Sequence, residues 1–180
     1  RTALELLHQM VPTSRAADNP DAWSDHAVSA AHIREHSPAN RMLAFPYTKL
    51  HNSQWNVDQA AGLILCSARV AENLGIDRHK WVFPRAFTES NFMSVVTSRK
   101  DLGASPGFRI AGQVALQLAG LSFNQIRLCE LYSCFPYAVR VQLQEFGLDW
   151  LHNVSVTGGM TFGGGPLNNF VFQATVRMVQ

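Results

Sequence analysis

Three residues with chemically active side chains stand together where a predicted strand passes into a predicted helix. Tyr132, Ser133 and Cys134 follow the predicted strand Ile126–Leu131. Ligand sites of open α/β sheets form at such strand ends. A helix N-terminus can lower the pKa of a cysteine thiol and make it nucleophilic, whereas a small thiol packed beneath the helix stays inert. Both interpretations of Cys134 stay open, and no histidine lies in this stretch to act as its base.

A glycine-rich loop, from Gly158 to Gly165, precedes the last predicted helix. Successive backbone N–H groups and the helix dipole can hold an anion or a developing oxyanion there. The loop lacks the Gly-Lys-Ser/Thr of a P-loop and the following acidic strand of a dinucleotide-binding fingerprint. The structural alternative is that glycines let a tight turn pass beneath a buried helix.

The segment His32–His36 reads His-Ile-Arg-Glu-His and matches the H-x-x-E-H pattern of one class of zinc peptidases. On a helix, His32 and His36 would share a face and could bind zinc, with Glu35 as the base. Because proline follows at once and no third ligand is evident, a solvated helix end is the simpler interpretation. We therefore expect no metal site.

From Val57 onward, short apolar runs alternate with helical periodicity. This alternation predicts an α/β fold with a mixed, largely parallel sheet and helices on both faces. Cys66 and Cys129 lie inside strand runs and are expected in the core. A short helix is expected after Ser24, which would be its N-cap. The expected strands are 60–66, 81–87, 126–131 and 154–157, and the expected helices are 68–74, 106–119, 134–146 and 166–180, with Ser67, Ser105 and Ser133 as N-caps and Gly75, Gly120 and Gly147 as helix ends.

The last predicted helix, residues 166–180, is apolar on nearly its whole circumference, and Arg177 is its only charge. A helix of this kind must be buried on all sides. The sequence shows no later element that could cover it. We therefore expect the chain to be one lobe of a larger fold.

Composition limits the classes of protein to consider. The chain has 180 residues, 47% of them hydrophobic, and a formal net charge of +2. This is enough for a single core, and the weak charge argues against nucleic-acid binding. No apolar run is long enough to span a membrane, and the first residues lack a signal-peptide layout. Three cysteines, an odd number, predict a reducing, cytoplasmic compartment without a disulfide framework.

Several motifs resemble, in their residues and in their order along the chain, the C-terminal half of the thiolase superfamily. The similarity is greatest to bacterial thiolase-like proteins usually described as acetyl-CoA acetyltransferases, and it covers residues 37–180. Residues 1–36 are then expected to form a separate irregular or helical segment. The motifs are PYTKL (Pro46–Leu50), VDQAA (Val57–Ala61) with SARVAENLG, WVFP (Trp81–Pro84), YSCFP (Tyr132–Pro136) and TGG…GGPxNN (Thr157–Asn169).

The resemblance implies two similar lobes packed as layers, αβαβα, with the last helix buried at the centre. It also implies a coenzyme A thioester as substrate, no separate cofactor, and a homodimer or hetero-oligomer. The nucleophilic cysteine of thiolases belongs to the N-terminal lobe, which is missing here. The histidine of the thiolase Gly-His-Pro motif corresponds to Gly165, which has no side chain to act as a base.

The resemblance also assigns roles to individual residues. Tyr132 and Cys134 are the candidate catalytic residues, Tyr132 as a phenolic donor or acid/base. The amides of Gly163, Gly164 and Gly165 are the candidate oxyanion donors, and Phe135 and Asn168 are candidate substrate-binding residues.

Three functions stay open. The chain is expected to be the C-terminal half of a thiolase-like acyltransferase, inactive without its other lobe. Alternatively, it belongs to a catalytically degenerate protein that binds acyl-CoA or serves as a scaffold. It could also be a subunit of a carbon–carbon lyase that acts on coenzyme A thioesters by a retro-aldol reaction.

Overall fold

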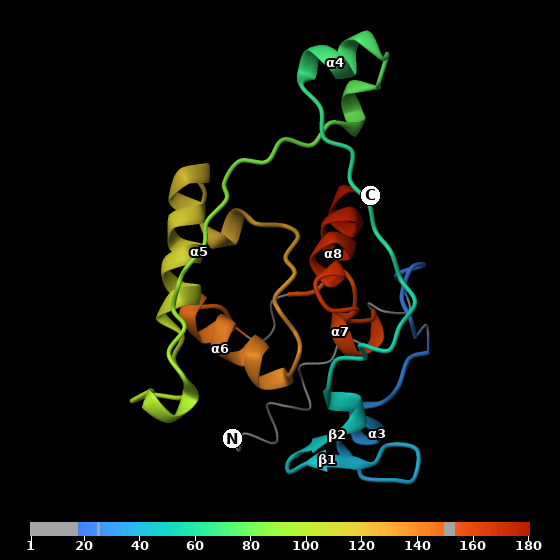
Figure 1. The fold of residues 1–180 in the computed structure, drawn as a ribbon, viewed down its shortest axis with the longest axis vertical. Helices are drawn as coiled ribbons and strands as arrows, with labels where there is room; N and C mark the ends of the chain where they lie inside the picture. The colour runs from blue at the N-terminus through green and yellow to red at the C-terminus, as the bar shows by residue number, and fades with distance from the viewer. Residues whose placement is uncertain (1–17, 25, 150–153) are drawn as a thin grey trace.

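The computed structural model describes residues 18–24, 26–149 and 154–180. In Figure 1 the helices α5 and α6 lie together on one side, α7 and α8 lie next to them, and α4 stands apart at one end. The strands β1 and β2 lie at the opposite end with α3. The elements are α3 (Ala30–Arg34), β1 (Met42–Ala44), β2 (Tyr47–Thr48), η1 (Lys49–His51), α4 (Ala68–Asn73), η2 (Arg78–Lys80), η3 (Val96–Ser98), α5 (Pro106–Ala119), η4 (Phe123–Gln125), α6 (Pro136–Phe146), α7 (Gly159–Phe162) and α8 (Asn169–Val179).

Several predicted helix ends are confirmed. The Ser67 hydroxyl accepts a hydrogen bond from the N–H of Val70 and caps α4. Helices α5 and α6 end at Gly120 and Gly147, which have φ angles of 68° and 66°. Glycine is the residue that adopts this left-handed conformation without strain. Ser105 precedes α5 as expected, but its side chain makes no capping hydrogen bond.

Helix α6 begins at Pro136, two residues later than predicted. Proline disfavours the helical conformation in the residue before it, and Phe135 is extended, with φ −141° and ψ 151°. The Ser133 hydroxyl, predicted to cap α6, instead accepts a hydrogen bond from the N–H of Met160 at 3.0 Å. Cys134 therefore lies outside the first turn of the helix. The helix expected after Ser24 also begins later than predicted: α3 begins at Ala30 and is capped by Ser29.

The only sheet among the described residues is the antiparallel pair β1–β2. The four segments predicted as strands form none, although one hydrogen bond joins two of them, from Leu131 N–H to the Val154 carbonyl at 2.9 Å. The layered, largely parallel sheet is therefore not confirmed. A strand needs a hydrogen-bonding neighbour on at least one edge. Ile64, in the first of these segments, is 93% exposed. Cys66 is also exposed, so its predicted place in the core was wrong.

Two small hydrophobic clusters hold the glycine-rich loop and α6. Ile33 of α3 packs against Phe162 of α7. Leu131 packs against Val139 and Leu143 of α6. The loop is thereby fixed from the side of α3, and the chain before Tyr132 is fixed from the side of α6.

Helix α8 begins at Asn169, three residues later than predicted, and buries one face. Phe170 and Ala174 are buried on that face, whereas Val171 and Phe172 are 62% and 50% exposed. Its burial on all sides, at the centre of a layered fold, is not seen in this structure. No described helix has the length and apolar character that a membrane span needs.

Helices α5 and α6 pack closely at Gly112. A Cβ atom at Gly112 would lie 2.2 Å from Cε1 of Phe146, so the small residue permits this approach. Glu145 of α6 accepts a hydrogen bond from the N–H of Ser105 and pairs with Arg109 at 3.6 Å. Its carboxylate therefore stabilises the positive end of the α5 dipole.

Candidate functional site

Glu130 holds the start of the glycine-rich loop. Its Oε2 atom accepts hydrogen bonds from the N–H groups of Val156 (2.7 Å) and Thr157 (3.0 Å). Its Oε1 atom accepts from the hydroxyls of Ser155 (3.0 Å) and Thr157 (3.0 Å). Burial raises the pKa of Glu130, and these hydrogen bonds oppose part of that rise. One carboxyl group thus fixes three consecutive residues.

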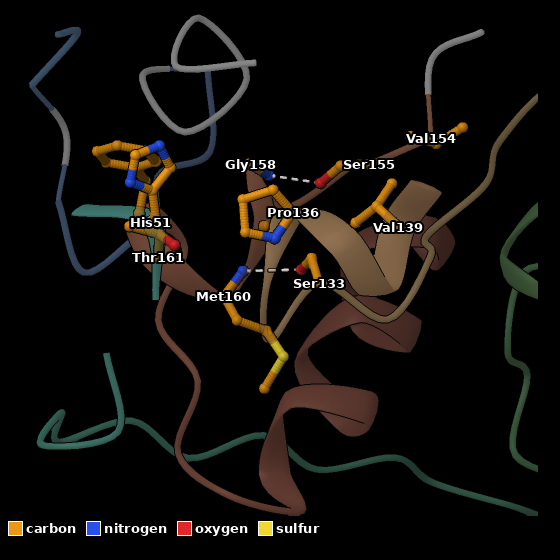
Figure 2. A pocket seen from close by; sticks show the side chains of 11 residues that line it. His51, Ser133, Pro136, Val139, Val154, Ser155, Gly158, Met160 and Thr161 are labelled. Atoms are coloured by element: carbon orange, nitrogen blue, oxygen red, sulfur yellow. Dashed lines mark hydrogen bonds between the residues drawn. The ribbon is translucent and has the colours of Figure 1, made fainter. Parts of the chain in front are cut away.

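The two hydroxyls extend this network into the loop. Ser155 Oγ accepts from the N–H of Gly158 at 2.9 Å, as Figure 2 shows. Thr157 Oγ1, in a fully buried side chain, accepts from the N–H of Gly159 at 3.1 Å. The amides that open the loop are therefore used inside the chain.

A cavity of about 40 Å³ lies between the loop and the start of α6 (Figure 2). Ser133 and Met160 are joined beside it by their hydrogen bond, and Pro136 and Val139 line its other wall. A water molecule occupies about 30 Å³ of liquid volume. The cavity has room for water and is much smaller than the pockets of about 300–1,000 Å³ that usually hold small molecules.

The backbone of Tyr132 is positioned by Gln142, a buried residue of α6. Gln142 Oε1 accepts from the Tyr132 N–H at 3.0 Å, and Nε2 donates to the Tyr132 carbonyl at 2.8 Å. Nε2 also donates to the carbonyl of Ala138 at 2.8 Å. The Gln142 side chain thus supplies hydrogen-bond partners to both the backbone N–H and the backbone carbonyl of Tyr132, as a neighbouring strand would do. The Tyr132 residue itself is 47% exposed.

The side chains of Tyr132 and Cys134 are neighbours, and each shifts the pKa of the other. Burial raises the pKa of the Tyr132 hydroxyl, and the neighbouring Cys134 adds to the rise. Burial also raises the pKa of the Cys134 thiol, although the neighbouring Tyr132 hydroxyl opposes this. Both groups are protonated at neutral pH. The lowered thiol pKa considered for a helix N-terminus is not found, because burial outweighs the interactions that lower the pKa of Cys134.

A short segment after η1 links this pair to the glycine-rich loop. The N–H of Ser53 donates to the carbonyl of Cys134 at 3.1 Å. The N–H of Gln54 donates to the carbonyl of Met160 at 3.0 Å, and its carbonyl accepts from Gly165 at 2.9 Å. The two predicted parts of the site are thus held side by side by a third segment.

The glycines proposed as oxyanion donors are tightly packed. The amide of Gly163 donates to a carbonyl of the preceding turn at 2.8 Å, and that of Gly165 donates to Gln54. Gly164 has φ 99°, and a Cβ there would lie 2.0 Å from Oε1 of Gln59. Two of the three amides therefore already have acceptors within the chain. Their role toward a substrate stays a prediction.

The two residues predicted to bind substrate lie apart. Phe135 lines a larger cavity of about 500 Å³, and its ring centroid lies 5.8 Å from that of Tyr47. Asn168 is exposed at the start of α8 and does not line this cavity. The structure therefore places Phe135, but not Asn168, beside a space that could hold a ligand.

The His32–His36 motif does not form the geometry of a zinc peptidase. Helix α3 ends at Arg34, and Glu35 is extended, with φ −79° and ψ 132°. His32 and His36 therefore do not share one helical face. In the part of the chain that the structure describes, no group of three or more His, Cys, Asp or Glu could hold a metal ion.

Comparison with solved structures decides the fold. A crystal structure described as a monomeric SCP2-thiolase like protein type 1 from Mycobacterium smegmatis superposes with a TM-score of 0.82 and 28% sequence identity. The superposition covers 98% of this chain. The fold is thiolase-like. The chain spans 39% of the length of that protein. No family model and no curated protein sequence matches the chain.

The thiolase-like fold supports the resemblance inferred from the motifs, at the level of the superfamily. It does not test the assignment to acetyl-CoA acetyltransferases, the position of the chain as a C-terminal lobe, or the division at residue 36. The similar protein is described as monomeric, so the comparison gives no support to the expected homodimer.

Sequence reasoning missed two residues of the site. Glu130 lies in the predicted strand 126–131, where every residue except Arg127 and Glu130 is apolar, and a carboxylate in such a segment is a signal for a buried, hydrogen-bonded group. Gln142 gives no such signal, because a glutamine in a helix is ordinarily a surface residue.

Proposed function

We propose that this chain is the C-terminal half of a thiolase-like protein that binds acyl-CoA, with acetyl-CoA acetyltransferase chemistry in the complete protein. The observation that carries the proposal is the neighbouring pair Tyr132–Cys134, whose backbone is positioned by Gln142 and Ser53. It is held beside a fixed glycine-rich loop in a thiolase-like fold.

In this proposal Tyr132 donates a hydrogen bond to the thioester carbonyl. Its raised pKa keeps the hydroxyl protonated at neutral pH, so it acts as a donor and not as a base. Its backbone is fixed by Gln142 on both sides, which favours a defined position for the ring. A donor directed at the carbonyl oxygen stabilises the negative charge that develops there during acyl transfer.

Cys134 supports Tyr132 and does not act as the nucleophile. A thiol with a raised pKa is poorly nucleophilic, because the thiolate is the reactive form. The nucleophile then has to come from the other lobe of the complete protein, and residues 1–180 alone are expected to be inactive.

Binding of acyl-CoA without turnover is the second candidate. It is favoured by the intrachain hydrogen bonds of Gly163 and Gly165 and by the absence of a side chain at Gly165. A protein of this kind would hold the thioester beside Tyr132 but lack a general base. The lyase alternative is less favoured, because a retro-aldol reaction needs a base and Tyr132 stays protonated.

The test uses the full-length protein and two variants, Tyr132→Phe and Cys134→Ala, with Cys66→Ala as the matched control at an exposed cysteine. We expect acetoacetyl-CoA to bind in calorimetry, and Tyr132→Phe to lower kcat for its thiolysis by about 10²-fold, the range of one lost donor. Retained binding without turnover favours the binding protein. Cleavage of a 3-hydroxyacyl-CoA favours the lyase. Absence of binding refutes the proposal, and unchanged turnover in Tyr132→Phe removes this residue from the mechanism.

A further inference from the structure

The cavity of about 500 Å³ lies beside the proposed site and has the size of a small-molecule pocket. It lies between the β1–β2 pair, the chain before α5, and the first turns of α6. Most of its lining is apolar. The lining residues are Leu43, Ala44, Tyr47, Asn52, Arg99, Leu102, Ala104, Ser105, Phe108, Phe135, Tyr137, Ala138 and Val141.

Arg99 is the only charged side chain among the described residues that line this cavity. Its Nε atom donates to the carbonyl of Ser94 at 2.9 Å, and its guanidinium lies over the ring of Phe92, at 5.4 Å from the ring centroid. Within the described ranges, no carboxylate forms an ion pair with it. One edge of the guanidinium is thus held in place, and its terminal nitrogens can bind an anion by two parallel hydrogen bonds.

The aromatic part of the cavity adjoins the Tyr132–Cys134 pair. Tyr47 and Phe135 form a ring contact in its wall. The pKa of Tyr47 is raised by burial and further by Tyr137 and Cys134. Phe135 directly follows Cys134 in the chain, so this wall adjoins the residue that carries the thiol. A ligand in the cavity can therefore reach from Arg99 toward the proposed reaction site.

We propose that the cavity binds an apolar acyl chain that ends in a carboxylate, with the carboxylate on Arg99. This inference rests on the proposed function, in which the thioester lies at Tyr132. The apolar lining suits the methylene chain. The single cation of the lining, which forms no ion pair with a described carboxylate, selects an anionic end group. The substrate class is then an ω-carboxyacyl-CoA, the coenzyme A thioester of a dicarboxylic acid.

The first arm of the test measures the binding of simple ligands that carry no coenzyme A to the cavity. The full-length protein is titrated in a calorimeter with decanoate and with 1-decanol. We expect decanoate to bind more tightly by about tenfold, the size of one charge-assisted hydrogen bond. Arg99→Gln should remove this preference, and Lys100→Gln, at the adjacent exposed cation outside the lining, should keep it. Equal binding of acid and alcohol by the unmodified protein, or an unchanged preference in Arg99→Gln, overturns the proposal.

The second arm separates this proposal from the proposed function. Decanedioyl-CoA should bind about tenfold more tightly than decanoyl-CoA, and Ala104→Phe, which fills the cavity, should weaken both. If both thioesters bind equally, the carboxylate proposal fails and the proposed function stands. If decanoate binds through Arg99 but neither thioester binds, the proposed function fails and the anion site stands. Competition between free coenzyme A and decanoate, lost in Arg99→Gln, would assign Arg99 to a coenzyme A phosphate and overturn the carboxylate assignment.

Discussion

Replacing Glu130 by alanine should destabilise the protein far more than replacing it by glutamine. The carboxyl group accepts from two backbone amides, those of Val156 and Thr157, whose positions are fixed by the loop. It also accepts from two hydroxyls, which can rotate toward other acceptors. Alanine removes every one of these acceptors, whereas glutamine keeps one oxygen in nearly the same place.

The magnitude follows from the two amides. A buried donor left without an acceptor costs about 1–3 kcal/mol, so Glu130→Ala should lower the free energy of unfolding by roughly 2–6 kcal/mol. Glutamine retains an acceptor for the amides and removes a buried charge. Its effect should stay within about 1.5 kcal/mol, the size of one neutral hydrogen bond.

The unmodified protein and the Glu130→Gln variant should also differ in how their stability depends on pH. Burial raises the pKa of Glu130, so the folded state favours the protonated carboxyl group. Its contribution to stability is fully present below the pKa of the unfolded chain and is lost as the pH rises through the higher pKa of the folded state. Glutamine does not titrate. The stability of Glu130→Gln relative to the unmodified protein should therefore increase as the pH rises through that window.

The assay is urea denaturation followed by tryptophan fluorescence at several pH values from about 4, near the ordinary glutamate pKa, to about 8. Hydrogen exchange at Val156 and Thr157 reports the loop directly. If Glu130→Gln is as destabilised as Glu130→Ala, the amides do not depend on the carboxyl oxygen. If the free energy of unfolding of Glu130→Gln differs from that of the unmodified protein by the same amount across this pH range, the assigned pKa shift is refuted.

Two further predictions concern reactivity and packing. Because burial raises the pKa of Cys129 to about 11 and also raises that of Cys134, whereas Cys66 is exposed, iodoacetamide at neutral pH should alkylate Cys66 first, as mass spectrometry of peptides would show. Faster labelling of Cys134 would contradict its assignment as an inert thiol. Gly112→Ala should lower the free energy of unfolding by about 1–3 kcal/mol, because the added methyl group overlaps a ring of α6. Gly62→Ala, where a Cβ meets nothing within 4 Å, is the matched control, and an equal loss in both variants would show that α5 and α6 do not pack as described.

The sequence by itself determined the features that depend on neighbouring residues. Helix ends at Gly120 and Gly147 follow from the left-handed conformation that glycine permits, and the N-cap at Ser67 follows from a hydroxyl placed three residues before an unsatisfied amide. The order of the motifs also indicated a thiolase-like fold, which the structural comparison supports. Even the late start of α6 was present in the sequence, since Pro136 constrains Phe135.

Only the tertiary structure decided which side chains meet. Glu130 and Thr157 are 27 residues apart, and the hydrogen bonds between them depend on how the two segments pack. Local spacing also could not show that the Cys134 thiol would be buried, which raises its pKa. Strand formation failed as a prediction for the same reason: an apolar run supplies a surface to bury, but a strand needs a partner that local sequence does not specify.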